Sequence, residues 1–306
     1  MTATAQQPPK RTWQRVDGVL LLDKPLGLTS NDALQRARRL FSAAKAGHTG
    51  TLDPAASGLL PLCFGEATKF SADLLDADKT YEAVVCLGVT TDSGDAEGRV
   101  IATDPVDAVD EAAIRRVLPQ FTGAIQQIPP MHSALKHQGR PLYELARQGI
   151  EIERPARTVT IHGLELLDFS GTTLALRVHC SKGTYIRTLA ADLGRALGCG
   201  AHLAALRRTE VGGLDLNQAV TLAELEALDE SGRHARLLPV DSLLQSLPRV
   251  DLDPVAAERF RHGNPVDLPP GLSGKSRVYA DNRLIGLGQP GPAQRLWPKR
   301  LVQSAA

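Results

Sequence analysis

Cysteines and long apolar runs are scarce in this 306-residue chain. Its four cysteines are widely spaced and form no CxxC pair, a pattern typical of small buried hydrophobic residues in a reducing compartment. No apolar run approaches the ~18–20 residues of a membrane-spanning helix, and residues 1–10 lack the apolar core of a signal peptide. We therefore expect a soluble, cytoplasmic protein without membrane contact.

Signature motifs of several enzyme classes are also missing. The chain contains no GxxxxGK[ST], GxGxxG or GxSxG, so phosphate-loop, dinucleotide-binding and serine-hydrolase functions lack their signature. The eight histidines are scattered without the spacing of metal ligands, and no zinc site is predicted. Asp92, Asp95 and Glu97 precede Gly98, but their spacing does not fit a calcium loop, and we expect a solvated hairpin turn there.

Charge of one sign does not dominate, because the formal net charge is only +1. The charges are nevertheless segregated along the chain. Residues 1–50 and 257–306 each hold eight Lys and Arg against three acids, and residues 177–208 hold six against one. Together these three basic segments could line a surface that binds a polyanion. The alternative is that each is an ordinary solvated helix face.

Apolar patterning predicts both strands and helices. Strands are expected at residues 18–23, 59–65, 81–89, 158–169 and 172–180, with helices at residues 29–41, 107–121, 142–149 and 184–198. The polar residues 1–16 are predicted to be a disordered tail, and residues 126–157 a basic arm inserted into a sheet domain. A boundary near residues 231–250 precedes a small, turn-rich β module.

The most distinctive stretch is residues 47–58, which hold three glycines, one proline and a single acid, Asp53. Asp53 either caps the next turn through an Asx hydrogen bond or serves as a reactive carboxylate on a loop pinned between buried elements. Tyr81 and Tyr185 lie beside basic residues at the start of regular elements. Each either stacks on a nucleic-acid base or packs half-buried with a solvated hydroxyl.

Six motifs follow one another along the chain: GVLLLDKP (18–25), GHTGTLDP (47–54), KTY (79–81), IPPMHSALK (128–136), CSKGTYIR (180–187) and GAHLAALRR (200–208). Together they resemble the motifs of the TruB family of bacterial tRNA pseudouridine synthases. The resemblance implies an α+β fold: a catalytic domain (17–246) on a long mixed or antiparallel sheet with flanking helices, an RNA-binding thumb (126–157), and a β-rich PUA-like domain (247–306). It also implies the isomerisation of uridine 55 in the T-loop of tRNA to pseudouridine, without a cofactor, metal or guide RNA.

The resemblance also implies roles for individual residues. Asp53 matches the catalytic aspartate, as nucleophile or as base for a ribose proton, and Arg187 matches the arginine that pairs with it. Tyr81 matches the ring that stacks on the flipped base. Further substrate contacts are implied for His48, Tyr185 and Leu206, and a supporting position at the site for Lys24 and Pro25. The implied partner is the T-arm of tRNA, extended toward the acceptor stem by the C-terminal module. We expect a monomer without an obligate protein partner.

Three other functions compete with this interpretation. The first is a non-catalytic RNA-binding or tRNA-folding protein on the same scaffold. The second is the guide-RNA-dependent relative of eukaryotes and archaea, which works inside a multi-protein particle. The third is a glycoside hydrolase, which requires a second acid near Asp53.

Overall fold

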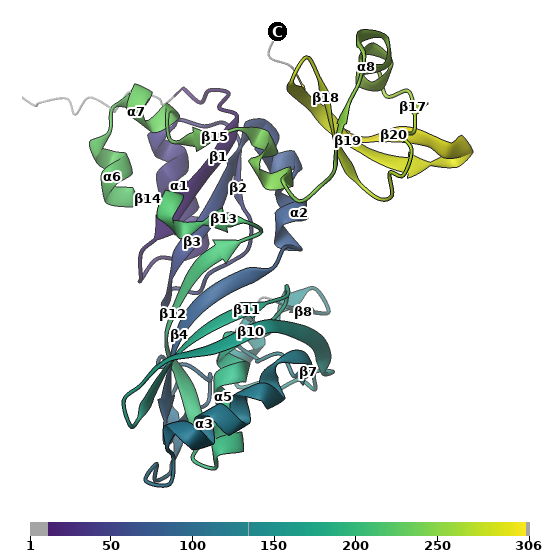
Figure 1. The fold of residues 1–306 in the computed structure, drawn as a ribbon. Helices are drawn as coiled ribbons and strands as arrows, with labels where there is room; N and C mark the ends of the chain where they lie inside the picture. Colours follow the sequence, from purple (N-terminus) through teal and green to yellow (C-terminus); the bar gives the residue numbers. More distant parts are fainter. Residues whose placement is uncertain (1–11, 134, 304–306) are drawn as a thin grey trace, which may run out of the picture.

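The computed structural model describes residues 12–133 and 135–303, and it confirms the α+β class (Figure 1). Most of the predicted disordered tail, residues 1–11, lies outside the described residues. The prediction is wrong for the rest of the tail. Gln14 forms a β-bridge with Ala43, and Val16 is only 4% exposed in the core beside the first helix. Burial of one apolar side chain thus orders the end of this segment.

Within residues 12–133 and 135–303, eleven strands make the main sheet and eight α-helices lie along the chain. The strands of the main sheet are β1 (Gly18–Lys24), β2 (Ala46–His48), β3 (Ala56–Phe64), β4 (Lys79–Leu87), β7 (Gly123–Gln127), β10 (Arg157–Phe169), β11 (Thr173–Cys180), β12 (Ala201–Val211), β13 (Leu214–Asp215), β14 (Val220–Thr221) and β15 (Leu237–Leu238). The helices are α1 (Ser30–Leu40), α2 (Ser71–Leu75), α3 (Glu111–Val117), α4 (Leu142–Arg147), α5 (Ile186–Leu197), α6 (Leu222–Ala227), α7 (Glu230–His234) and α8 (Pro254–Arg261).

The main sheet runs in the order β14-β1-β3-β12-β4-β11-β10-β7. Along this path β14 and β1 are parallel, as are β3 and β12, and the other neighbours are antiparallel. The late strand β12 therefore lies between β3 and β4, two strands formed much earlier in the chain. This insertion joins the two halves of the sheet at its centre (Figure 1).

Both faces of the first half of the sheet are covered, which explains its continuous apolar strands. Leu60 and Leu62 of β3 pack under α1 and α6, whereas Leu59 and Cys63 pack with residues of α2 and of the 3₁₀ segment Val240–Leu244. Alternate residues of one strand thus serve two cores, as the period of a strand requires.

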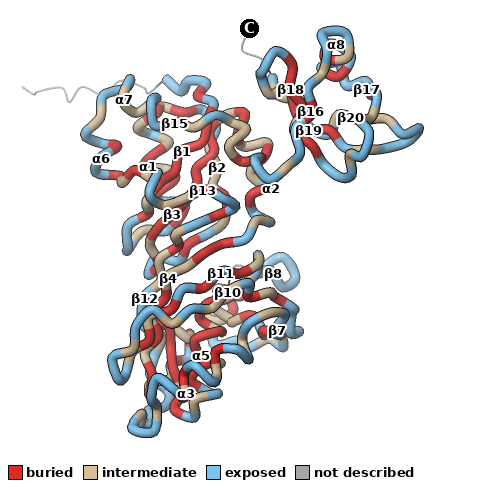
Figure 2. Tube along the Cα trace, in the orientation of Figure 1, coloured by how far each residue is buried: buried red, intermediate tan, exposed pale blue. Residues whose placement is uncertain are grey.

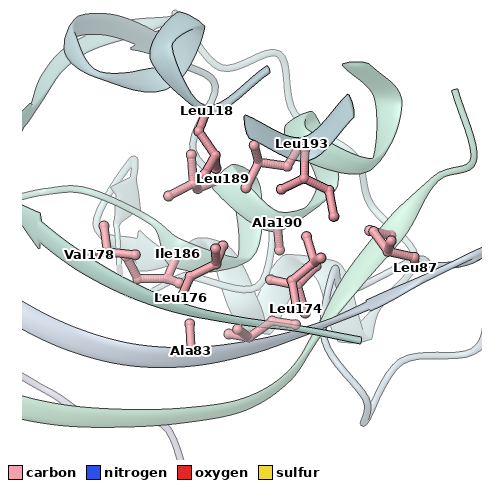
Figure 3. Packing of buried hydrophobic residues seen from close by; sticks show 14 of the residues in the cluster. Ala83, Leu87, Leu118, Leu174, Leu176, Val178, Ile186, Leu189, Ala190 and Leu193 are labelled. Atoms are coloured by element: carbon pink, nitrogen blue, oxygen red, sulfur yellow. The ribbon is translucent and has the colours of Figure 1, made fainter. Parts of the chain in front are cut away.

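In the second half of the sheet, α5 packs on β4, β11 and β12 (Figure 3). Leu189 and Leu193 lie one helical turn apart and contact the apolar face of β11, which includes Leu174 and Leu176. Gly198 ends the helix in the left-handed conformation, with φ of 79°. The packing fixes α5, and therefore the residues at its first turn, against the centre of the sheet.

A separate five-stranded sheet occupies the C-terminal part, in the order β16-β18-β19-β20-β17. Its strands are β16 (Arg249–Asp251), β17 (Val266–Asp267), β18 (Ser276–Ala280), β19 (Arg283–Gly291) and β20 (Arg295–Leu301). With α8 it has a small core of its own, visible as the buried segments in Figure 2. Leu287 of β19 packs instead with the core of the main sheet, and the Lys69 ammonium donates to the Leu301 carbonyl at 3.0 Å.

Residues 128–156 leave the main sheet after β7 and return to it at β10. They hold a short hairpin, β8 (Lys136–His137) with β9 (Arg140–Pro141), followed by α4. The first two residues of the predicted arm, Gln126 and Gln127, belong to β7 and pair with β10. A second small hairpin, β5 (Val89–Thr91) with β6 (Val100–Thr103), confirms the turn predicted after β4.

Candidate active site

Asp53 lies in a loop between β2 and β3 that other segments hold in place. The hydroxyl of Ser30, the first residue of α1, donates to the Leu52 carbonyl at 3.0 Å, and the Leu52 N–H donates back to that hydroxyl at 2.8 Å. The Gly27 N–H donates to the Pro54 carbonyl at 2.8 Å. The Asp53 side chain, 52% exposed, is thus presented to solvent on a backbone tied to α1 and to the turn after β1.

The Asp53 carboxylate does not cap the following turn. Within residues 12–133 and 135–303, no backbone N–H donates to it, and the turn is closed by the Ala56 N–H on the Asp53 carbonyl at 3.0 Å. Its Oδ2 lies 3.2 Å from Nη2 of Arg187. The Asx interpretation is therefore wrong, and the carboxylate is held by a guanidinium.

Arg187, the second residue of α5, is a buried connector with a side chain only 10% exposed. Besides the contact with Asp53, its Nη1 donates to Oδ2 of Asp95 at 3.1 Å. Its Nη2 donates to the backbone carbonyl of His132, in the segment after β7, at 2.6 Å. One guanidinium thus joins the Asp53 loop, the hairpin turn and the inserted segment. Since a planar guanidinium offers donors in a fixed fork, it also fixes the orientation of both carboxylates.

Asp95 is not among the site residues predicted from the sequence, because residues 92–98 are expected there to form a solvated turn. That assignment is wrong for Asp95, whose side chain is 14% exposed. Its Oδ1 accepts from the Ser93 hydroxyl, and the turn is docked on β12 through Leu203, whose N–H donates to the Gly94 carbonyl at 2.9 Å. Docking on β12 turns the carboxylate inward. The contact joins residues more than a hundred positions apart, so local spacing gave no signal for it.

A cavity of about 290 Å³ opens beside Asp53. Five residues singled out from the sequence line it: Asp53, Tyr81, Tyr185, Arg187 and Leu206. They come from the loop before β3, from β4, from the start of α5 and from β12. The structure therefore brings together, in one hollow, a carboxylate, its cationic partner, two phenol rings and an apolar wall.

The two tyrosines of this cavity are held in position by different contacts. Tyr81 lies on β4 opposite Arg208 of β12, and burial raises the pKa of its hydroxyl although the guanidinium of Arg208 opposes the rise. Tyr185 is held by its backbone, because its N–H donates to Oε1 of Gln127 at 3.0 Å. Burial also raises the pKa of Tyr185, and both hydroxyls are therefore protonated at neutral pH.

Three residues predicted near the site, Lys24, Pro25 and His48, do not line the cavity. The Lys24 ammonium is fully buried and donates to the carbonyls of Pro25 and Leu28 at 2.8 and 2.7 Å. It thereby closes the turn whose Gly27 holds Pro54. Nδ1 of His48 is buried without a hydrogen-bond partner within the described part of the chain, and burial lowers the pKa of this imidazole.

Two further cations line the cavity and were not predicted as site residues. The guanidinium of Arg208, with the residue 1% exposed, donates from Nε to the Leu59 carbonyl at 2.8 Å and from Nη2 to the Gly50 carbonyl at 3.2 Å. The Lys79 ammonium donates to the carbonyls of Leu75 and Ala77 at 2.7 and 2.6 Å.

The pKa of Lys79 falls to about 8, first because of burial and second because of the nearby Arg208 charge. Position 58 requires glycine because the backbone of Arg208 lies beside it. A Cβ there would lie 2.3 Å from the Arg208 carbonyl oxygen, and the glycine has φ of 102°.

The arrangement suits chemistry that needs one ionised carboxylate beside a bound ring. Among residues 12–133 and 135–303, no group of three or more His, Cys, Asp or Glu side chains is placed to hold a metal ion. No helix in the same part of the chain is long and apolar enough to cross a membrane. Asp95 is a second acid near Asp53, but its carboxylate is already engaged by Arg187 and Ser93.

Comparison with known proteins points to one family over most of the chain. Residues 38–186 match the profile described as "TruB family pseudouridylate synthase (N terminal domain)". Residues 187–245 match "tRNA pseudouridylate synthase B C-terminal domain", and residues 248–302 match "Pseudouridine synthase II TruB, C-terminal".

Curated relatives are similar over almost their full length. The tRNA pseudouridine synthase B of Dechloromonas aromatica (strain RCB) is 74% identical over 97% of this chain and 99% of the relative. That of Aromatoleum aromaticum is 60% identical over 95% of this chain and 94% of the relative. Among solved structures, a chain of a Cbf5-Nop10-Gar1 complex is 27% identical with a TM-score of 0.73, covering 98% of this chain and 91% of that one.

Proposed function

The chain belongs to the TruB family of pseudouridine synthases, which makes it an isomerase, and we propose that it converts uridine 55 in the T-loop of tRNA to pseudouridine. The observation that carries this proposal is the Asp53 carboxylate, 3.2 Å from Arg187, at a cavity lined by Tyr81 and Leu206. Membership of this family excludes the glycoside-hydrolase alternative. The geometry of the site would not exclude that alternative by itself, because Asp95 is a second acid near Asp53.

In the proposed reaction the N-glycosidic bond of the uridine breaks, the base rotates, and C5 joins the ribose. A base inside a folded loop is out of reach, so it must first be flipped out of its stack. We propose that Tyr81 stacks on the flipped base and that Leu206 forms the apolar wall behind it. Asp53, as nucleophile on the sugar or as base for a ribose proton, acts as a carboxylate on a fixed loop. Tyr185 completes the contacts to the nucleotide.

The ion-pair network around Arg187 is proposed to hold Asp53 in its reactive orientation. Asp95 on the other side of the guanidinium fixes the rotamer of Arg187, which in turn restricts Asp53. Burying such a network costs desolvation energy that only good geometry offsets. Asp95 is accordingly a positioning residue. Lys24 and Pro25 are proposed to support the loop through the turn at Gly27, and His48 to meet the RNA near the position that the base leaves.

The rest of the RNA needs a larger surface. We propose that residues 17–246 form the catalytic domain, that residues 126–157 close on the T-arm as a thumb, and that residues 247–306 bind toward the acceptor stem as a PUA-like domain. The three basic segments would then contact phosphates, so binding should weaken steeply with added salt. A tRNA substrate would place the enzyme in the cytoplasm.

We further propose that the chain acts alone, as a monomer without guide RNA or cofactor. The solved relatives named as Cbf5 complexes contain partner proteins, which makes this point worth testing. Activity of the purified chain on a bare tRNA transcript would support independent action. Activity only after addition of a guide RNA or a partner protein would contradict it.

The central test is tritium release from uridine labelled at C5 in an unmodified tRNA transcript. Formation of the new bond at C5 expels that hydrogen, so release reports isomerisation rather than binding. We expect release by the wild type and none by Asp53→Asn, with tRNA affinity changed no more than a few-fold. Binding by both proteins without release by either would favour the RNA-folding alternative. A large loss of affinity in Asp53→Asn would show that this residue is structural.

A further inference from the structure

Three buried cations of the site region have no carboxylate partner. Lys24, Lys79 and Arg208 are all under 9% exposed. Across residues 12–133 and 135–303, no Asp or Glu oxygen lies within 4.0 Å of their charged nitrogens. Within the same residues their hydrogen bonds run chiefly to backbone carbonyls, and Arg208 has the Tyr81 hydroxyl as a further neutral partner. These contacts give each cation neutral partners but no ion pair.

Such an arrangement is costly. A buried charge without an ionic partner loses hydration that neutral dipoles only partly replace. The depressed pKa of Lys79 reflects that cost, and Arg208 adds to it by repulsion. The other charges of the site offset this excess only in part. Arg187 pairs with both Asp53 and Asp95, which leaves one negative charge, and Asp53 also favours the charged form of Lys24. A positive excess therefore remains around Arg208 and Lys79 and favours an anion in the cavity.

Two of these cations line the cavity in which the proposed function places the uracil ring. Arg208 and Lys79 share its lining with Tyr81. Arg208 lies directly opposite Tyr81 in the β12–β4 pair, and Lys79 is two residues before Tyr81 on the same strand face. A base stacked on Tyr81 would have both charges as neighbours.

We propose that Arg208, assisted by Lys79, stabilises negative charge on the uracil ring while the base is detached from the ribose. This inference rests on the proposed function and adds a role to its site. When the bond between C1′ and N1 breaks, its electron pair goes to N1 and spreads to the ring oxygens O2 and O4. Asp53 meanwhile bonds to C1′ or takes a ribose proton. C5 then bonds to C1′ while the bond from Asp53 to C1′ breaks, or while the ribose regains its proton, and this bond formation makes the ring neutral again. The proton on C5 is finally lost and N1 takes up a proton.

A second source of negative charge is a phosphate of the bound RNA, and the two sources predict different measurements. A phosphate contact contributes to affinity and is indifferent to the chemistry of the base. Stabilisation of a ring anion contributes to the rate of the chemical step, and it matters less when the ring holds negative charge well by itself.

The test compares uridine with 5-fluorouridine at position 55 of the same tRNA transcript. Fluorine at C5 withdraws electrons and makes the ring anion more stable. Single-turnover rates are measured as disappearance of the substrate nucleotide after nuclease digestion, with the enzyme in excess over tRNA. Arg208→Gln removes the charge, Arg208→Lys keeps it, and Lys79→Gln removes the assisting one. Arg207→Gln is the matched control, because the neighbouring Arg207 pairs with Asp23 and does not line the cavity.

We expect Arg208→Gln to slow conversion of uridine by about 10²-fold. The same substitution should slow conversion of 5-fluorouridine by only about 10-fold. Arg208→Lys should recover part of the loss, Lys79→Gln should show the same trend more weakly, and Arg207→Gln should leave the ratio of the two rates unchanged. If Arg208→Gln does not fold, Arg208→Lys and Lys79→Gln decide the question by the same ratio.

Equal losses on both substrates would overturn the inference, and a loss of affinity alone would assign the cations to a phosphate. Failure of the wild type on uridine would instead refute the proposed function, so the two failures are distinguishable.

Discussion

The two large sheets of this protein differ in how far their charged side chains are buried. In the main sheet, Lys79, Arg208 and Arg187 are buried near a cavity. In the C-terminal sheet, the ion pairs are on the surface: Arg249 with Asp251, and Arg295 with Asp267, whose carboxylate is 95% exposed. Both sheets are otherwise β-structures around apolar cores. Burial of the cations in the main sheet costs stability, and the exposed pairs of the C-terminal sheet carry no such cost. Buried charges of this kind are typical of sites that perform chemistry.

The largest effect expected from this comparison is a pH-dependent stability difference at Lys79. Its pKa is about 8 in the folded protein against an ordinary 10.5, so between these pH values the unfolded state binds more protons and stability rises with pH. Relative to Lys79→Met, the wild type should gain about 3 kcal/mol in free energy of unfolding between pH 7 and pH 10.5. Urea denaturation at both pH values measures this. An equal difference at the two pH values would contradict the assignment.

A second prediction concerns the buried carboxylate Asp95. Because it orients Arg187, Asp95→Asn should slow single-turnover tritium release by about 10²-fold, while tRNA affinity changes no more than a few-fold. Asp92→Asn is the matched control, since Asp92 lies in the same turn with its side chain 42% exposed and contacts Arg99 at 3.6 Å. A rate in Asp95→Asn equal to that of the control would remove Asp95 from the network.

The smallest effect is expected in the C-terminal sheet. Asp267→Asn removes the exposed end of a pair 3.4 Å from Arg295, and the melting temperature should change by less than about 2 °C, because solvent screens such pairs. A large effect of Asp267→Asn would erase the contrast between the two sheets.

Much of this arrangement could be predicted from local patterns. The run of apolar residues around Leu60 predicts β3, and the period of Leu189 and Leu193 predicts α5, as observed. The resemblance to the TruB family also selected Asp53 and Arg187, which the structure brings together. These features depend on residues close in sequence or on motifs that are easy to recognise.

The features that local patterns do not predict depend on contacts between distant segments. Residues 200–208 form one of the motifs that carry the family resemblance, but no strand is predicted from the sequence over residues 201–211. Docking between β3 and β4 makes them β12, with Arg208 buried and Arg207 partly exposed. The same docking turns Asp95 inward. Local propensity could not predict either result, since tertiary pairing decides them.

The position of β12 has a consequence for the order in which the protein can assemble. Asp53 and Tyr81 leave the ribosome more than a hundred residues before Arg208, yet the bond from Arg208 to Leu59 spans 149 positions. Before β12 is synthesised, β3 and β4 each lack the strand that pairs with them in the folded sheet. The nascent sheet then has unpaired edges of the kind that promote aggregation. Insertion of one late strand closes the sheet and completes the cavity in a single event. A nascent chain released before residue 208 would hold Asp53 and Tyr81 but lack the strand that completes the cavity around them.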